Sequence, residues 1–375
     1  MRDSDRERLS TPYAVPVEPV ADDRRLDVHL DLGIGHMIDV ADLILEDLDP
    51  AVGGIGWWKA YAQLARQERI FISDYLLLAA RSVYTNVAES YVHRLELSHA
   101  VDDFRTWLER STSSGQPVLV PESLYDDLAY VRIEANLAGI FRGLASALDC
   151  LGTCIVGVAG LPLAIVTTDF AKAKQYLNGR RARQNPRLQQ LARDLSDAEL
   201  ATGPAGWVKW LLDMRHMLVH RGRLSITIGI TSGPDGIEGL SLVLPKSPEL
   251  TEIQGWVYAA GRIAASFESD AEAILQSLTT STCSFLDAVG LKLSELWRER
   301  KLDHLLISEP SEQWREPGGL IKPVPTFNGY ALGPPAGSSE AREIDVSTEV
   351  ALRMRAAGIT RRRANDIGPS PEFWS

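Results

Sequence analysis

Along most of the chain, apolar residues recur every three or four positions, which is the spacing of one face of an α-helix. Residues 26–110 show this spacing, for example at Tyr75 and Leu78. A second helical stretch runs over residues 121–159 and begins with proline, a residue that helix N-termini favour. A third covers approximately residues 249–300. The pattern predicts a mainly α protein.

One segment departs from the helical spacing. In residues 224–230, apolar side chains, most of them β-branched, alternate with small or polar ones. Residues 240–244 form a second short apolar run. Between them lies Gly233-Pro-Asp-Gly236, whose residue types favour a tight turn. We therefore predict one β-hairpin over residues 224–244.

Residues 150–166 are almost wholly apolar and invite comparison with a transmembrane helix. The run is shorter than the ~20 residues that a membrane span needs. It is also interrupted by Gly152, Gly157, Gly160 and Pro162. We predict a buried core helix here and no membrane contact.

Composition divides the chain into four regions. Residues 1–24 are rich in proline and charge and are expected to form an arm, followed by an N-terminal helical region at 25–115. A helical domain at 120–305 comes next. The proline- and glycine-rich residues 306–375 are expected to form an extended tail.

The chain has 375 residues, 45% of them hydrophobic and 24% charged, and a net charge of −11. These values fit an ordinary soluble protein and argue against one that coats nucleic acid through bulk charge. Cys150, Cys154 and Cys283 are too few for a disulfide framework and are expected to be buried thiols. The charged N-terminus lacks the apolar run of a secretory signal, so we expect a cytoplasmic protein.

Residues 171–193 contain seven Lys or Arg residues and no acidic residue. Like charges repel one another, and a polyanion such as RNA would relieve that repulsion. The Asn-Gly and Asn-Pro steps in this segment predict a loop. Arg180, Arg181 and Arg183 are therefore candidate RNA-binding residues, and a solvated basic loop is the alternative interpretation.

The candidate chemistry lies in the segment Trp207-Val-Lys-Trp-Leu-Leu-Asp-Met-Arg-His-Met-Leu-Val-His-Arg-Gly222. Arg215 is followed directly by His216 and, after four intervening residues, by His220. A histidine can take a proton from a ribose 2′-hydroxyl, and an arginine can neutralise the charge that builds up on phosphorus. Such a pair can cleave RNA without a metal ion.

Other Arg–His pairs have a similar spacing, namely Arg24/His29, Arg94/His99 and Arg298/His304. Only the pair Arg215/His220 has histidine directly after the arginine. It is also the one pair in a Trp- and Leu-rich amphipathic helix closed by glycine.

This segment resembles the signature helix of the HEPN family (higher eukaryotes and prokaryotes nucleotide-binding), which carries arginine, a polar residue and, a few positions later, histidine. An upstream segment, Phe141–Leu151, is similar to the family's core helix with its "Arg…Ala-Leu-Asp…Leu" pattern. The resemblance covers residues 121–300 and implies a helical bundle of HEPN type. It also implies a metal-independent endoribonuclease of the kind used in bacterial toxin–antitoxin and antiphage systems.

Arg215 and His220 lie about 140° apart around an α-helix, so they do not share a face, whereas His216 and His220 do. The resemblance implies that two copies of the helix meet in a homodimer and form one cleft. His220 would then act as general acid or base and Arg215 would stabilise the phosphorane, with His216 beside them. Arg221 and Arg223 are further candidates for holding RNA. Asp149 either orients Arg215 or lies on the surface.

Two alternatives concern the same helix. His216 and His220 have the spacing of a zinc pair, but the metalloprotease motif needs Glu where Met217 stands. Any other metal site would need further ligands, which the sequence does not offer nearby, so we expect no metal and no cofactor. A non-catalytic HEPN scaffold would use the helix to dimerise and bind a nucleotide or a protein partner. In some HEPN toxins an antitoxin modifies a tyrosine two residues after the motif histidine. Here that residue is Gly222, so this regulation is not expected, although an antitoxin or defence-system partner is compatible with the family.

Overall fold

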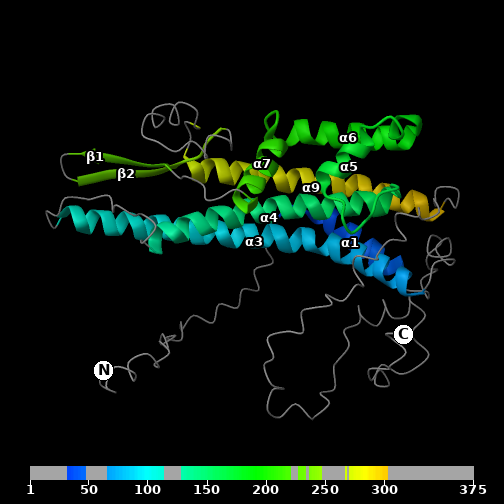
Figure 1. Ribbon diagram of the computed structural model, residues 1–375, viewed down its shortest axis with the longest axis horizontal. Coiled ribbons are helices and arrows are strands. Elements are labelled where there is room, and N and C mark those ends of the chain that lie inside the picture. The colour runs from blue at the N-terminus through cyan, green and yellow to red at the C-terminus, as the bar shows by residue number, and fades with distance from the viewer. Residues whose placement is uncertain are drawn as a thin grey trace, which may run out of the picture. The chain divides into compact units, whose positions relative to one another are not determined.

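The computed structural model describes residues 32–47, 66–113, 128–220, 227–233, 236–246, 267 and 270–302. Its helices are α1 (Gly35–Asp47), α3 (Arg66–Ser113), α4 (Leu128–Ala159), α5 (Phe170–Leu177), α6 (Pro186–Thr202), α7 (Trp207–His220) and α9 (Ala271–Leu302), with a 3-10 turn η6 (Ala182–Gln184) and strands β1 (Thr227–Gly233) and β2 (Gly236–Val243) (Figure 1). The predictions of a mainly α protein and of one hairpin are confirmed. The predicted arm 1–24 and tail 306–375, together with Arg221 and Arg223, lie outside the described residues.

The two long helices α3 and α4 pack against each other in antiparallel directions. Arg142 of α4 pairs with Glu89 of α3 at 3.1 Å. Arg132, which comes earlier in α4, pairs at 2.9 Å with Asp103, which comes later in α3. A Cβ atom on Gly143 would lie 2.7 Å from a backbone carbonyl oxygen of α3. A glycine at this position therefore allows the two backbones to approach closely.

Helix α9 brings α1 into the bundle. The backbone N–H of His36 donates to Asp287 Oδ1 at 2.9 Å, and His36 Nδ1 lies 2.8 Å from Asp287 Oδ2. A Cβ atom on Gly290 would lie 2.7 Å from the backbone nitrogen of Met37. These contacts join two helices that are far apart in the sequence.

The described helices share one hydrophobic core. Val83 and Leu97 of the predicted region 25–115 are buried in the same cluster as Phe141 and Leu148 of the predicted domain 120–305. The two regions therefore do not have separate cores. The described residues all belong to one compact unit.

Helix α4 is the central apolar element. By length and composition alone Tyr130–Ala159 could cross a membrane, but 78% of its most apolar window is buried inside the protein. This confirms a core helix as far as Ala159. The prediction that the helix continues to residue 166 is wrong. Gly160 adopts φ +65° and ends α4, and the next nine residues, 161–169, form a non-helical connection to α5.

The hairpin follows the predicted region closely. Strands β1 and β2 pair antiparallel, with Thr227 opposite Val243, and the register shifts after Thr231. Leu242 is buried, and its backbone N–H donates to Asp270 Oδ1 at 3.0 Å, just before α9. This bond fixes the hairpin to the start of α9, and Figure 1 shows the base of the hairpin beside that end of the helix.

The basic segment 171–193 is mostly helical, which corrects the prediction of a loop. Only residues 178–185 connect α5 to α6, and part of this connection is η6. Asn185 caps α6 by accepting from two backbone N–H groups, and Pro186 occupies its first turn. The Asn-Pro step is therefore a helix start and not a loop signal.

Candidate functional site

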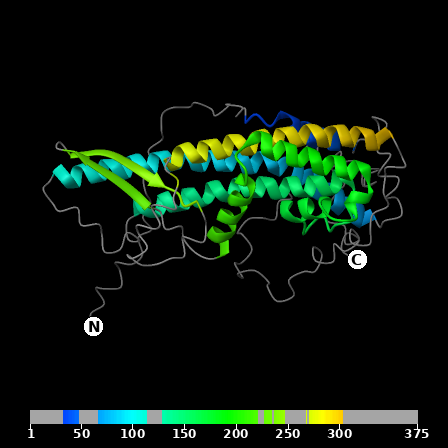
Figure 2. The same ribbon diagram turned by 90° about the horizontal axis from the view of Figure 1, so that it is seen from above.

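Helix α7 crosses the long helices of the bundle at a steep angle (Figures 1 and 2). One of its faces is apolar and packed against α4 and α9. The buried residues of this face are Trp207, Val208, Leu211, Met214 and Met217. The rings of Trp207 and Phe285 of α9 pack edge to face, with 5.9 Å between the ring centroids. This packing fixes the helix that carries the candidate motif.

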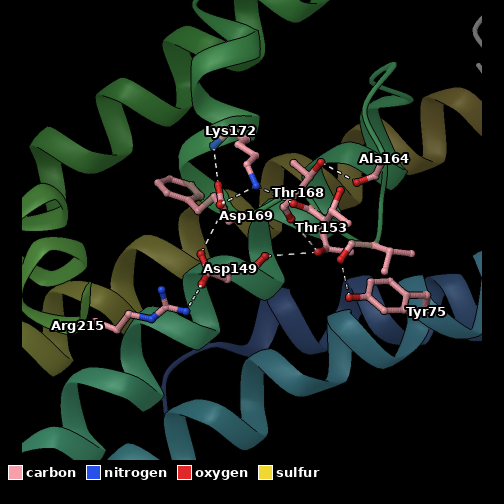
Figure 3. Close-up of polar contacts among 11 residues, drawn as sticks. Tyr75, Asp149, Thr153, Ala164, Thr168, Asp169, Lys172 and Arg215 are labelled. Atoms are coloured by element: carbon pink, nitrogen blue, oxygen red, sulfur yellow. Dashed lines mark hydrogen bonds and ion pairs between the residues drawn. The ribbon is translucent and has the colours of Figure 1, made fainter. Parts of the chain in front are cut away.

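Arg215 points towards α4 and pairs with Asp149 (Figure 3). Its Nη2 donates to Asp149 Oδ2 at 3.3 Å, and the two side chains are 33% and 27% exposed. The Nε–H of Arg215 is buried and has no acceptor among the described residues. Asp149 therefore contacts Arg215, which was one of the two alternatives for this residue, and the contact uses only one of the guanidinium donors.

Asp149 is also bonded to the first turn of α5. Its Oδ1 accepts from the backbone N–H of Phe170 at 3.4 Å. Gly152 of α4 makes this possible, because a Cβ atom there would lie 2.5 Å from the Phe170 nitrogen. The start of α5 can therefore lie directly against α4, one turn beyond Asp149.

The charge of Asp149 is balanced by these neighbours but is costly to bury. Burial raises the pKa of the Asp149 carboxyl above its ordinary value. The Arg215 guanidinium and the Phe170 N–H act in the opposite direction and lower the pKa, without cancelling the effect of burial. Burial is therefore the dominant influence on the pKa of this carboxyl.

A chain of polar contacts continues from Asp149 away from Arg215 (Figure 3). Thr153 Oγ1 lies 3.5 Å from both the Asp149 and the Thr168 carbonyl oxygens. Thr168 Oγ1 donates to the Ala164 carbonyl at 2.7 Å, and Tyr75 Oη donates to the Val166 carbonyl at 3.1 Å. These bonds hold the segment between α4 and α5 against α3 and α4.

The two histidines of the motif lie at the outer end of α7. His216 is exposed, as is Lys209 two turns earlier on the same face. His220 is the last helical residue, and its side chain lies outside the described residues. By helix geometry, position 220 follows position 216 by one turn on that face. Arg215 is instead directed towards α4.

The candidate RNA-binding arginines lie at the far end of α5. Arg180, Arg181 and Arg183 are exposed, and no acidic partner for them is found in the described part of the chain. Helix α5 has eight residues and is therefore about 12 Å long. The three arginines lie at one end of it, and Asp149 of α4 lies beside the other end. The structure therefore does not place these arginines in contact with Arg215.

Other basic residues of the segment are paired. Lys174 binds Glu199, and Arg187 lies 3.8 Å from Glu299. Lys172 donates to the Thr167 carbonyl at 2.9 Å and lies 3.3 Å from Asp169 Oδ2. These pairs leave Arg180, Arg181, Arg183 and Arg193 without an acidic partner among the described residues, and Arg193 donates to Gln190 Oε1 instead.

Sequence reasoning missed Asp169 and Lys172, which adjoin Asp149. The signal was present, because Asp169 stands three residues before Lys172 and accepts from its backbone N–H as the N-cap of α5. Cys150, next to Asp149, is partly exposed, and burial raises its thiol pKa to about 11. Cys154 and Cys283 are buried, as expected. Within the described ranges, no three His, Cys, Asp or Glu residues are grouped to hold a metal ion.

Comparison with known proteins gives no match: no family model, no curated protein and no solved structure matches this chain. The resemblance to the HEPN family therefore stays a prediction from the motif.

Proposed function

We propose that the protein is a metal-independent endoribonuclease of HEPN type that acts as a homodimer, with Arg215 and His220 in the catalytic cleft. The observation that carries the proposal is the position of Arg215. It lies on a packed helix, five residues before His220, and its guanidinium is held by Asp149 at 3.3 Å.

The state of Arg215 suits binding of a phosphate. Only one of its donors is bonded to protein within the described residues, and the group remains one-third exposed. A planar guanidinium with free donors binds the oxygens of a phosphate in a bidentate manner. The bond to Asp149 would restrict its rotamers before the substrate arrives.

The proposed chemistry needs one base and one acid. One His220 side chain takes the proton of a ribose 2′-hydroxyl, whose oxygen attacks the adjacent phosphorus. Arg215 stabilises the added negative charge on the phosphorane. The His220 of the second copy protonates the departing 5′-oxygen. The products are a 2′,3′-cyclic phosphate and a new 5′-hydroxyl end.

The test is cleavage of total RNA by purified protein in the presence of EDTA. We expect His220→Ala to lower the rate by ~10²–10⁴-fold, the typical contribution of a general acid or base, while the fold is retained. Arg215→Ala should lower it as well. Suitable controls are His99→Ala and Arg105→Ala, since both residues are exposed on α3, away from this site. Undiminished cleavage by the His220 variant would refute the assignment.

A non-catalytic scaffold is the second candidate, and one observation favours it. Arg215 is partly buried and ion-paired, as an arginine with a purely structural role would be. In that case Arg215→Ala would lower stability, and neither wild-type protein nor any variant would cleave RNA. The role as a toxin or antiphage effector, with an antitoxin or defence partner, belongs to the same proposal and rests only on the resemblance to the family.

A further inference from the structure

A pocket of about 300 Å³ opens beside Asp149, on the side away from Arg215. Its walls come from three parts of the chain: α3, α4 and the segment that leads from α4 to α5. Tyr75 and Ser82 line it on α3, Asp149 and Thr153 on α4, and Asp169 at the start of α5. Figure 3 shows Tyr75 and Arg215 on opposite sides of Asp149.

The wall of the pocket contains two carboxylates, Asp149 and Asp169. Tyr75 Oη and the Lys172 ammonium are already directed at the carbonyl oxygens of Val166 and Thr167. The two carboxylates, by contrast, keep unused capacity. An ionised carboxylate has about four acceptor positions.

Both carboxylates are only partly occupied by donors of the protein. Asp149 accepts once at Oδ1, from the Phe170 N–H, and once at Oδ2, from Arg215. Asp169 accepts the Lys172 N–H at Oδ1 and faces the Lys172 ammonium at Oδ2. About two positions therefore remain on each carboxylate within the described structure. A ligand that supplies N–H donors would fill them.

A flat heterocycle with adjacent N–H donors suits the carboxylates of Asp149 and Asp169 best. Unpaired RNA bases are commonly held against aromatic side chains and bonded along their Watson–Crick edges. Guanine has an imino N1–H beside an N2 amino group, so one edge of the base offers three N–H donors to carboxylates that lie side by side. Uracil has a single N–H between two carbonyl oxygens, and a carboxylate would repel those oxygens.

We propose that this pocket binds a guanine base, whose N1–H and N2–H groups donate to the free acceptor positions of Asp149 and Asp169. The ring would lie against Tyr75, whose position is fixed by the bond from its hydroxyl group to Val166. That the guanine belongs to an RNA strand rests on the ribonuclease proposed above.

The proposal is tested by equilibrium binding of the four nucleosides to the full-length protein, without phosphate and without any cleavage step. Guanosine should bind roughly tenfold more tightly than uridine, the size of discrimination that one bidentate pair provides. Ser82→Tyr should abolish guanosine binding by filling the pocket. Asp169→Asn should weaken it, because an amide N–H₂ would face the guanine donors, while asparagine retains the helix cap.

The matched control for the second variant is Asp197→Asn, an exposed aspartate of α6 that does not line the pocket. It should bind guanosine like the wild type, and thermal melting should show that each variant is folded. If guanosine binds no more tightly than uridine, or if Ser82→Tyr and Asp169→Asn leave its binding unchanged, the pocket proposal is overturned even when RNA is cleaved. If the wild type binds guanosine selectively but cleaves no RNA, the proposed ribonuclease fails and the guanine site stands.

Discussion

Asp149 accepts hydrogen bonds from two groups that belong to different helices. The Phe170 N–H comes from the start of α5, and the Arg215 guanidinium comes from the middle of α7. Replacing this one side chain therefore releases both groups. Arg215 would keep its charge but lose the bond that limits its rotamers.

The raised pKa of Asp149 leads to a prediction about pH. Between pH 3.8, the ordinary pKa of the carboxyl, and its raised pKa in the folded protein, Asp149 binds a proton more readily in the folded protein than in the unfolded chain. Wild-type stability should therefore increase relative to Asp149→Asn as the pH falls through that interval. Thermal melts of both proteins between neutral pH and pH 4 measure the difference. A relative loss of wild-type stability on acidification would show that the Arg215 pair outweighs burial.

At the scale of single residues, the sequence identified Arg215, His216 and Asp149 but left open whether Asp149 contacts Arg215. Asp149 precedes Arg215 by 66 positions, and no spacing rule connects residues so far apart. The bond from Phe170 was beyond sequence reasoning for another reason. It uses a backbone N–H, which every residue except proline carries, so the residue type gives no signal.

At the scale of elements, the site depends on how closely α5 approaches α4. Gly152→Ala should destabilise the protein by about 1–3 kcal/mol, because the new Cβ would lie 2.5 Å from a backbone atom that cannot rotate away. The same change should weaken RNA cleavage by displacing Phe170 from Asp149. Chemical denaturation measures the first effect and initial rates measure the second.

Gly35→Ala is the matched control for this substitution. Gly35 begins α1, its φ is not positive, and a Cβ there would meet nothing within 4 Å. Alanine at this position should be neutral or slightly stabilising. Equal stability of the two variants would contradict the role given to Gly152.

The three arginines after α5 lead to a prediction about salt. Replacing Arg180, Arg181 and Arg183 by Glu should weaken RNA binding and reduce its salt dependence. The log–log slope should fall by about 0.7 for each phosphate that the protein no longer neutralises. Cleavage at saturating RNA should survive better than cleavage at limiting RNA.

Reversal of Arg105, Arg110 and Arg298, which are also exposed, provides a charge-matched control. This variant should keep the wild-type salt slope. If the first variant keeps it as well, the basic segment is a solvated surface, and Arg215, Arg221 and Arg223 remain as the candidates for holding the strand.

Most of the elements could be predicted from the spacing of apolar residues and from the turn at 233–236. The errors fell where three-dimensional contacts decide. The end of α4 depends on the positive φ of Gly160, and α6 begins at an Asn-Pro step that also occurs in loops. The glycines of α4 were interpreted as interruptions, whereas Gly152 and Gly157 lie at close contacts with α5 and α3.

At the scale of the whole molecule, the proposed cleft requires a second copy. Arg215 is directed towards α4, whereas His216 lies on the exposed face that also contains position 220. We predict a symmetric dimer whose axis passes near Trp207–Arg221. Light scattering at micromolar concentration should give twice the mass of the 41.3 kDa chain. A monomer would contradict the prediction.

A cross-link locates the axis. His216→Cys should form a disulfide between copies under mild oxidation, because the same position on two copies comes close together at a two-fold axis. Thr106→Cys, at an exposed position of α3, is the control and should not form one. A dimer that cross-links through neither cysteine would place the axis elsewhere.

The contact between α1 and α9 also has a consequence during synthesis. His36 and Asp287 are 251 positions apart. At about 5–20 residues per second, the ribosome completes the contacting part of α9 roughly 10 to 50 seconds after it has made α1. During that interval α4, the most apolar helix, lacks the cover that α9 later provides. A chain that stops before Ala271 would keep this surface uncovered permanently. We therefore expect prematurely terminated products to aggregate or to be captured by chaperones.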